Sequence, residues 1–389
     1  MQENVIIVGA SVAGIGALSE LRKCGYSGAI TLIDAQSHLP YDRPPLSKAL
    51  LTGECEAQAL AFHDADHYER LGVTLKLGRL ARAIESGALA VELENGERVL
   101  GHAIIIATGA SARRMVSPNV NIRTIRDLDD AIQLRTALLE SARRLALIGG
   151  GFIGAEIASS ARRLGREVTI FDVAALPFAR ILGEEVALRI RSMHEEAGVE
   201  LVCGAAVRNV SRQANEGYAL DLGDQRVHRA DIVVAGLGAT PNIAWLADSG
   251  LDLDDGVICD DRGRTNHAAI YAAGDVAKWI DARTGSRGRH EHWTSAREQA
   301  RIVARTIAGA SGAAWAEFTP YFWSDLHGRR IQVLGSPDGA DDVAIVHDRP
   351  ESGAFLAEYR REGKLIGVAG CNAAAKTMRY LAVLAKQAN

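Results

Sequence analysis

The 389-residue sequence predicts an α/β protein with two similar parallel-sheet domains and a smaller α+β domain at its C-terminus. The main observation is an internal duplication, because residues 5–34 and 145–172 follow one plan. Each has a short apolar run, a glycine-rich turn, an amphipathic segment, a second apolar run and a final aspartate. The second observation is a change of pattern near residue 309, beyond which short alternating segments replace continuous apolar runs.

Each repeat has the features of a Rossmann-like dinucleotide-binding unit. Its apolar runs are short and rich in valine and isoleucine, as in strands of a parallel sheet that is covered on both faces. The first glycine of the turn permits a tight bend, and the last lets the helix pack closely on the strand. The helix start then offers free N–H groups and its positive dipole end to a pyrophosphate. The turn residues are Gly9, Ser11 and Gly14 in the first repeat, and Gly149, Gly151 and Gly154 in the second.

The two repeats end at Asp34 and Asp172, roughly 20 residues after the turn. An acid in this place bonds a ribose hydroxyl of the dinucleotide, and it repels the 2′-phosphate of NADPH. The first arginine after Asp172 is Arg180, which is too far along to receive that phosphate readily. The second repeat is therefore predicted to prefer NADH to NADPH.

Further segments complete these units and define a third. Buried strands that run into a glycine-containing turn are expected at residues 101–109, 230–242 and 270–275, and hairpins around residues 95–96 and 215–217. Antiparallel strands are expected at residues 330–335, 343–347, 354–360 and 365–370, followed by a helix over 373–386. The chain is accordingly divided into a discontinuous first domain (1–107 and 230–309), an inserted second domain (108–229) and a C-terminal domain (310–389).

Composition and charge argue against several classes of function. The net charge is −4, and no run of basic residues forms the stripe expected of a nucleic-acid binder. No apolar run reaches the roughly 18 residues that a membrane span needs. The first residues lack the basic region of a secretory signal, so we expect a cytoplasmic protein with no membrane partner. The five scattered cysteines are expected to be free thiols, and no metal site is expected.

The most specific motifs lie partly outside the glycine turns. They are LPYDRPPLSK (39–48), ATG (107–109), GGGFIGAE (149–156), GATPN (238–242), AGD (273–275) and FWSD (322–325). Their order resembles the flavoproteins with two dinucleotide-binding domains that are related to glutathione reductase. Within that group, the chain resembles the ferredoxin reductases of bacterial oxygenases and cytochromes P450, together with the putidaredoxin and rubredoxin reductases. The resemblance implies FAD at the first turn and NADH at the second.

The resemblance also implies roles for single residues. Lys48 would lie beside flavin N5, where an arriving hydride builds negative charge, and Glu156 would pair with this lysine and keep it charged. Asp275 would accept a hydrogen bond from the ribityl chain of FAD, and Arg43 would contact the pyrophosphate. Further cofactor contacts are implied at Thr108, Gly109, Gly238 and Trp293.

The segment WTSARE (293–298) predicts a helix start. Ser295 and Glu298 have the spacing of a capping box, which pairs two side chains with the first free N–H groups. The resemblance places this positive helix end at the flavin pyrimidine ring, where it would stabilise an anionic reduced flavin. Trp293 would then line the nicotinamide side, unless it is a buried structural tryptophan.

The absence of certain cysteines favours an acceptor that docks from outside. Disulfide reductases of the resembled superfamily carry a cysteine pair before the flavin lysine, but here the region reads HLPYDRPPLSK. We therefore expect a one-electron acceptor, either a [2Fe–2S] ferredoxin or a rubredoxin. The alternatives are a small-molecule reductase of quinone or monodehydroascorbate type and a redox-signalling flavoprotein of the apoptosis-inducing type. Departures from the resembled pattern occur at Ser11, Ala35 and Leu326.

Overall fold

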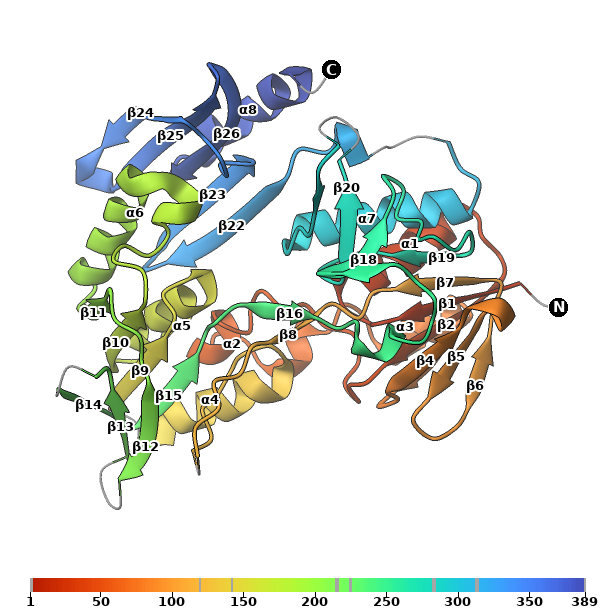
Figure 1. Ribbon diagram of the computed structural model, residues 1–389, viewed down its shortest axis with the longest axis horizontal. Coiled ribbons are helices and arrows are strands. Elements are labelled where there is room, and N and C mark those ends of the chain that lie inside the picture. The colour runs from red at the N-terminus through yellow and green to blue at the C-terminus, as the bar shows by residue number, and fades with distance from the viewer. Residues whose placement is uncertain are drawn as a thin grey trace.

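The structure is a computed structural model that describes residues 3–118, 120–140, 143–213, 217–223, 226–281, 285–311 and 315–387. Two parallel sheets lie at opposite ends of the molecule, and the C-terminal sheet lies over the second of them (Figure 1). The predicted α/β class with a C-terminal α+β unit is confirmed. The turn of the hairpin predicted at residues 215–217 falls largely outside the described residues, but the segments on either side of it, 209–213 and 217–221, pair as antiparallel strands.

The first repeat forms the centre of a five-stranded parallel sheet with the order β19-β7-β1-β2-β3. The strands are β1 (Asn4–Val8), β2 (Ala29–Asp34), β3 (Val73–Leu77), β7 (Ala103–Ile106) and β19 (Ile270–Ala272). Val5, Ile6 and Ile7 are fully buried, so both faces of β1 are covered, as the continuous apolar run predicts. Helices α1 (Val12–Lys23) and α7 (Trp293–Ile307) pack together on this sheet.

The second repeat forms a four-stranded parallel sheet with the order β11-β10-β9-β15. The strands are β9 (Arg144–Ile148), β10 (Glu167–Asp172), β11 (Val199–Cys203) and β15 (Ile232–Ala235). Its helices are α4 (Leu128–Glu140), α5 (Phe152–Arg163) and α6 (Ala179–Glu196). Strand β15 leads back towards β19, so the first sheet is completed only after the chain has formed the second.

Smaller antiparallel units surround the two sheets. They are β4 (Ala81–Glu85), β5 (Ala90–Leu93) and β6 (Arg98–Leu100); β12 (Asn209–Gln213), β13 (Gly217–Asp221) and β14 (Val227–Ala230); β8 (Ala110–Ala112) with β16 (Ala239–Pro241); and β17 (Leu253–Asp254), β18 (Gly256–Cys259), β20 (Ala277–Ile280) and β21 (Arg287–Gly288). In this last sheet β18 and β20 run parallel. The turn between β5 and β6 confirms the hairpin predicted at Asn95 and Gly96.

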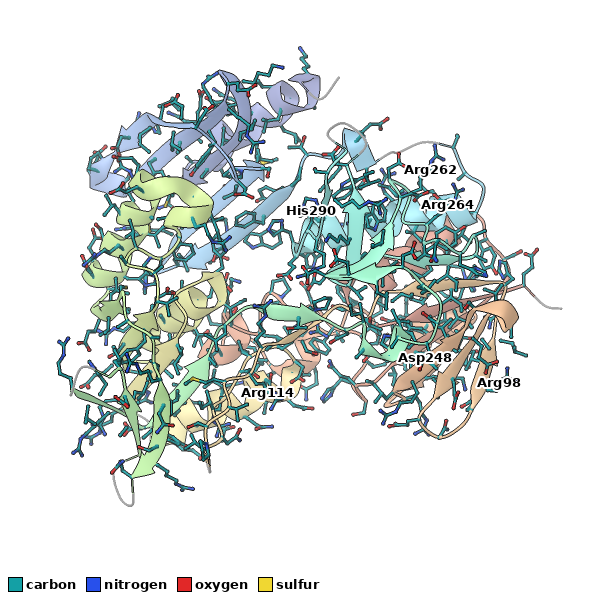
Figure 2. The ribbon with its side chains drawn as sticks, in the orientation of Figure 1. Arg98, Arg114, Asp248, Arg262, Arg264 and His290 are labelled. Atoms are coloured by element: carbon teal, nitrogen blue, oxygen red, sulfur yellow. The ribbon has the colours of Figure 1, made fainter. Side chains whose placement is uncertain are left out.

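Short helices complete this part of the chain. They are α2 (Ala49–Thr52), α3 (Ala65–Arg70) and the 3-10 turns η1 (Ala57–Leu60), η2 (Ser86–Ala88), η3 (Ala244–Leu246), η4 (Trp315–Glu317) and η5 (Pro350–Ser352). Charged side chains such as Arg98, Arg262 and Arg264 lie on the outside of the first sheet and its flanking units (Figure 2). Among the described residues, none of the helices combines the length and the apolar character that crossing a membrane requires.

The C-terminal unit is a five-stranded antiparallel sheet with the order β22-β23-β26-β25-β24. Its elements are β22 (Tyr321–Leu326), β23 (Arg329–Gly335), β24 (Asp342–Arg349), β25 (Ala354–Arg361), β26 (Lys364–Cys371) and α8 (Ala374–Gln387). The four strands and the helix predicted here are confirmed. The sequence analysis missed β22, the strand that carries the FWSD motif.

The C-terminal sheet packs against α5 and α6 of the second repeat. One apolar cluster contains Leu182 and Ile190 of α6 together with Leu326 and Phe355 of the sheet. Beside it, a histidine pair joins the same elements, since His194 Nδ1 lies 2.9 Å from His327 Nε2.

Lowering the pH should weaken this joint through the histidine pair. Burial and the neighbouring imidazole lower the pKa of His194 to about 3, while burial and Arg329 lower the pKa of His327 to about 4. Both values lie below the ordinary 6.5, so between pH 6.5 and 4 the unfolded chain binds more protons than the folded one. The stabilisation is therefore present near pH 7 and is lost as the pH falls through this window.

We expect the melting temperature of a His327→Asn variant to fall less steeply than that of the wild type between pH 6.5 and 4. Asparagine suits position 327 because the backbone there has φ +50°, a left-handed conformation. A variant of the exposed His102, His102→Gln, serves as the control and should follow the wild-type slope. Equal slopes for His327→Asn and the wild type, measured by thermal denaturation, would contradict the role given to the histidine pair in the pH dependence of stability.

Candidate functional site

The two glycine-rich turns have nearly the same backbone geometry. Gly9 and Gly149 have φ values of +110° and +104°, which side-chain-bearing residues rarely adopt. A Cβ on Gly9 would lie 2.1 Å from the carbonyl oxygen of Ala107, and one on Gly149 would lie 2.4 Å from that of Gly236. Each first glycine thus lets the strand end pass directly against the backbone of the neighbouring strand.

Of the other two motif positions, the third has no space for a side chain, whereas the second has. A Cβ on Gly14 or Gly154 would lie 1.9 or 2.2 Å from the carbonyl oxygen of the first glycine in its own turn, so the helix approaches the strand as expected. A Cβ on Gly151 would meet no atom within 4 Å. The protein itself therefore leaves room for a side chain there, which explains how the first turn accommodates Ser11.

Asp34 and Asp172 hold their turns by matching hydrogen bonds. One oxygen of each aspartate accepts, at 2.6 Å, from the N–H that follows the first glycine, in Ala10 or Gly150. The other oxygen accepts from the backbone N–H of the residue two positions after the aspartate itself, at 2.8 Å for Asp34 and 2.7 Å for Asp172. A carboxylate has about four acceptor positions, so both remain able to bind a ribose hydroxyl. This structural role was missed in the sequence.

The helix starts beside both turns are open to an anion. Neither N-cap residue, Ser11 of α1 or Gly151 of α5, makes a side-chain capping bond, and the first turn of each helix carries no acid. The free N–H groups and the positive dipole end are therefore available to a phosphate. At α1, a pocket brings Ser11 and Asp34 together with Tyr41 and Arg43.

Lys48 and Glu156 form an ion pair between the first and second sheets' units. Lys48 Nζ lies 2.7 Å from Glu156 Oε2 and also donates to the carbonyl oxygen of Pro44 at 3.1 Å. Glu156 is only 4% exposed, because α5 is buried on almost every side from Gly154 to Ala161. The structure thus brings together two residues that are 108 positions apart in the printed sequence.

Two serine hydroxyls complete the surroundings of Glu156. Ser47 Oγ donates to Oε2 at 2.6 Å, and Ser324 Oγ donates to Oε1 at 2.7 Å. Ser47 is held in turn, since its carbonyl oxygen accepts from Ser160 Oγ at 2.6 Å. Neither Ser47 nor Ser324 was singled out in the sequence, although both stand inside the diagnostic motifs.

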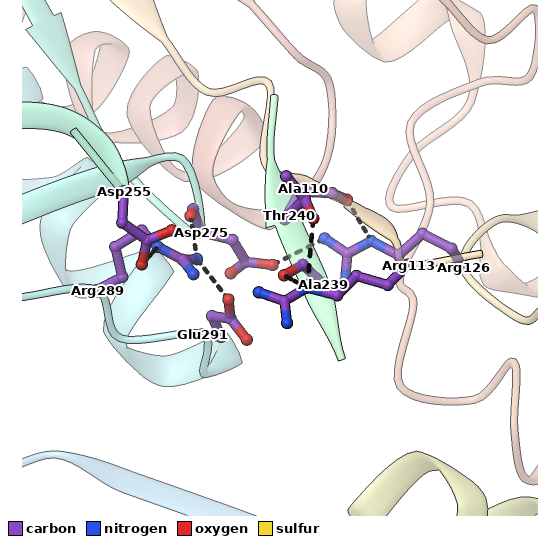
Figure 3. A network of polar contacts seen from close by, with 9 residues as sticks. All are labelled: Ala110, Arg113, Arg126, Ala239, Thr240, Asp255, Asp275, Arg289 and Glu291. Carbon is purple, nitrogen blue, oxygen red and sulfur yellow. Dashed lines mark hydrogen bonds and ion pairs between the residues drawn. The ribbon is translucent and has the colours of Figure 1, made fainter. Parts of the chain in front are cut away.

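Asp275 forms an ion pair that the sequence analysis also missed. Its Oδ2 accepts from Arg126 at 2.7 Å, and Arg126 Nε donates to the carbonyl oxygen of Ala110 at 2.7 Å (Figure 3). Arg43 donates to the carbonyl oxygen of Arg126 at 2.9 Å, and burial lowers the pKa of Arg43. Asp275 and Arg43, both expected at FAD, therefore belong to one network whose centre is Arg126.

On its other side, Asp275 is held by its backbone. Its carbonyl oxygen accepts from Arg289 at 3.0 Å, and Arg289 forms ion pairs with Asp255 and Glu291 (Figure 3). The side chain of Asp275 is therefore aimed at Arg126 from a fixed backbone position.

The expected ATG and GATPN positions lie on a short ribbon between the two sheets. Thr108 Oγ1 donates to the carbonyl oxygen of Asn242 at 3.1 Å, and Asn242 Nδ2 donates back to that of Thr108 at 2.8 Å. Gly109 and Gly238 have φ values of +66° and +84°, as the turns of this ribbon require. The cofactor contacts expected at these residues stay predictions.

The capping box expected at Ser295 and Glu298 is wrong. Helix α7 begins at Trp293 with His292 as its N-cap, so Ser295 lies inside the first turn, and Glu298 pairs with Arg301. The spacing misled because residues three apart lie on one face throughout a helix, not only at its start. Trp293 Nε1 donates to Asp42 Oδ1 at 2.8 Å, which ties the helix start to the loop that leads to Lys48.

Unpaired polar atoms gather at the start of α7. Ser295 Oγ and Gln299 Nε2, both in fully buried residues, and His292 Nδ1 have no hydrogen-bond partner within the part of the chain that is described. Gln299 Oε1 accepts from the N–H of Gly274, directly before Asp275. Because buried polar groups are nearly always hydrogen-bonded, such atoms beside Asp275 fit a bound polar cofactor such as FAD.

The fold and these sites define an oxidoreductase with two dinucleotide sites, and comparison with known proteins gives its family. Residues 3–300 match the family described as pyridine nucleotide-disulphide oxidoreductase, and residues 321–389 match the one described as reductase C-terminal. The chain belongs to the pyridine nucleotide-disulphide oxidoreductase family and carries the reductase C-terminal domain. Its cofactors are FAD and NADH.

Several relatives match over nearly their whole length. The rubredoxin-NAD(+) reductase of Pseudomonas putida is 34% identical over 92% of this chain and 93% of its own. The ferredoxin–NAD(+) reductase component of the anthranilate 1,2-dioxygenase system of Burkholderia cepacia is 35% identical over 94% and 90%. Among solved structures, the covalent putidaredoxin reductase–putidaredoxin complex has a TM-score of 0.92 at 28% identity, covering 99% of this chain and 93% of that one. The ferredoxin reductase for the CYP199A2 system of Rhodopseudomonas palustris has a TM-score of 0.92 at 30% identity, covering 97% and 93%.

Alanine substitutions at two glycines of the second turn should have different effects, one on the stability of the protein and the other on NADH binding. Gly154→Ala places a methyl group against a backbone oxygen, so we expect it to lower the free energy of unfolding by roughly 2 kcal/mol or more. Gly151→Ala has room in the protein but would intrude on the dinucleotide that is predicted to bind at this turn. We therefore expect wild-type stability and about tenfold weaker NADH binding, or about 1.4 kcal/mol. Thermal unfolding and NADH titration measure the two effects. Equal losses of stability would contradict the difference between the positions.

Proposed function

We propose that the protein transfers electrons from NADH to a [2Fe–2S] ferredoxin that serves an oxygenase or a cytochrome P450. Bound FAD supplies the chemistry that converts a two-electron donor into single-electron steps. The observation that carries the proposal is the buried ion pair between Lys48 and Glu156, formed where the first and second units meet. The relatives named as ferredoxin reductase components of dioxygenase systems support the choice of acceptor.

In this proposal, Lys48 and Glu156 act as a pair. The ionised carboxylate keeps the lysine ammonium in one place, 2.7 Å away. A fixed positive charge stabilises negative charge that develops nearby during the reaction, and it does so most strongly where water is largely excluded. The remaining proposed cofactor contacts fall into two groups: Gly9, Ser11, Gly14, Asp34, Arg43, Thr108, Gly109 and Asp275 for FAD, and Gly149, Gly151, Gly154, Asp172, Gly238 and Trp293 for NADH.

The cysteines support an acceptor that docks from outside. Cys55 is the nearest thiol in sequence to Lys48, but it packs against the apolar cluster that contains Leu50 and Leu134. Burial raises the pKa of Cys55, so it stays a thiol and is a poor nucleophile near neutral pH. All five cysteines are free, which suits a reducing compartment, and we place the protein in the cytoplasm.

The function is tested by mixing the FAD-loaded protein with NADH under anaerobic conditions and then with a [2Fe–2S] ferredoxin. We expect rapid bleaching of the flavin, followed by ferredoxin reduction in one-electron steps. Relatives named as rubredoxin reductases make rubredoxin the second acceptor to test. Bleaching that only a quinone reverses would overturn the proposal in favour of a small-molecule reductase.

Lys48→Ala should slow flavin reduction by NADH at least about tenfold, because the charge that stabilises the reaction is removed. The FAD content should stay near that of the wild type, since most of the proposed FAD contacts lie elsewhere. Lys364→Ala, at an exposed lysine of the C-terminal sheet, is the matched control and should reduce at the wild-type rate. A wild-type rate for Lys48→Ala in single-turnover measurements would remove Lys48 from the reaction.

A further inference from the structure

A single hydroxyl interrupts an otherwise apolar face of β22. Phe322, Ser324 and Leu326 alternate onto the side that meets α5 and α6, and both apolar residues belong to the cluster formed there. Ser324 is 1% exposed, and a buried hydroxyl without a partner would destabilise the fold. Its partner is the carboxylate of Glu156, on the facing helix, at 2.7 Å.

The two oxygens of Glu156 are occupied unequally. Oε2 accepts from both Lys48 and Ser47, whereas Oε1 accepts from Ser324 alone among the residues that the structure describes. Removing the Ser324 hydroxyl would leave Oε1 unpaired in a buried place. The carboxylate could then rotate about its last bond and draw Oε2 away from the lysine.

We propose that Ser324 is a positioning residue for the reaction with NADH: through Oε1 it sets the orientation of Glu156 and thereby the place of the Lys48 ammonium. This inference rests on the proposed function of Lys48 and Glu156. It gives the C-terminal domain a part in electron entry, because β22 supplies the hydroxyl. The hydroxyl touches neither substrate nor cofactor in this role and acts only through the carboxylate.

A second contact between the same elements provides the control. Three residues beyond Ser324, the N–H of His327 donates to Ser159 Oγ at 2.7 Å, and Ser159 lies one helical turn beyond Glu156. Ser159→Ala therefore removes a buried hydroxyl from the same interface without touching the carboxylate. A general loosening of the interface would affect both variants alike, whereas loss of positioning would affect only Ser324→Ala.

The experiment measures single-turnover flavin reduction by NADH in the FAD-loaded wild type, Ser324→Ala, Ser159→Ala, Glu156→Gln and the double variant Ser324→Ala/Glu156→Gln. The absorption spectrum of each oxidised holoprotein gives a readout independent of turnover, since it responds to charge near the flavin. Ser324→Cys, which replaces the hydroxyl by a somewhat larger thiol and keeps a weak donor, covers the case in which the alanine variant folds poorly.

We expect NADH to reduce the flavin of Ser324→Ala about tenfold more slowly than that of the wild type. The rate for Ser324→Cys should lie between these two, and that for Ser159→Ala within about twofold of the wild-type rate. The flavin spectrum of Ser324→Ala should shift in the same direction as that of Lys48→Ala, by a smaller amount. In the Glu156→Gln background, Ser324→Ala should cause little further change, because its effect passes through the carboxylate.

Equal rates for Ser324→Ala and Ser159→Ala would overturn the inference, and so would an undiminished effect of Ser324→Ala in the Glu156→Gln background. A slow Glu156→Gln variant beside a wild-type Ser324→Ala variant would refute the role of Ser324 and leave the proposed function standing. A wild-type rate for Glu156→Gln would instead refute the function proposed for the ion pair itself.

Discussion

The buried carboxylate of Glu156 imposes the strictest demand on this structure. An ionised group that is 4% exposed is stable only when it is paired and fully hydrogen-bonded. Its donors come from the loop before α2 and from β22, while the carboxylate itself stands on α5. The first unit, the second unit and the C-terminal sheet must therefore be assembled correctly before the group is satisfied, so the ion pair reports on the placement of all three.

In the glycine-rich turns, some positions are held by contacts within the protein, and one position faces open space. In both repeats, the first and last glycines lie directly against neighbouring backbone atoms, and the aspartate side chain accepts a hydrogen bond from a backbone N–H of the turn. The turn therefore keeps one conformation without help from a ligand, and a fixed conformation reduces the conformational entropy lost on binding. Of the three glycine-motif positions, only the second faces open space, and of these three it alone differs between the repeats, as Ser11 and Gly151.

Sequence reasoning recovered the features that repeat or that follow a short-range rule. The two parallel sheets follow from apolar runs and glycine spacing. The pairing of Lys48 with Glu156 was implied only by the family resemblance that the motifs around them carry. Ser324 and Arg126 were missed because their partners lie in distant segments, and no local period marks such a contact. Strand β22 was missed because its exposed and buried positions mix aromatic and polar residues, which blurs the alternation. At Ser295, a true local rule pointed to the wrong N-cap residue, because the helix begins two residues earlier, at Trp293.

The position of β19 in the chain bears on how the protein emerges from the ribosome. This edge strand pairs with β7, yet it is made only after the whole second sheet, from β9 to β15, has been translated. The second sheet has all its strands within one stretch and can close early, while the first waits with the edge of β7 uncovered and without α7 over α1. Nascent chains in this interval expose an unpaired apolar strand, the kind of surface that chaperones hold and that aggregates when they do not.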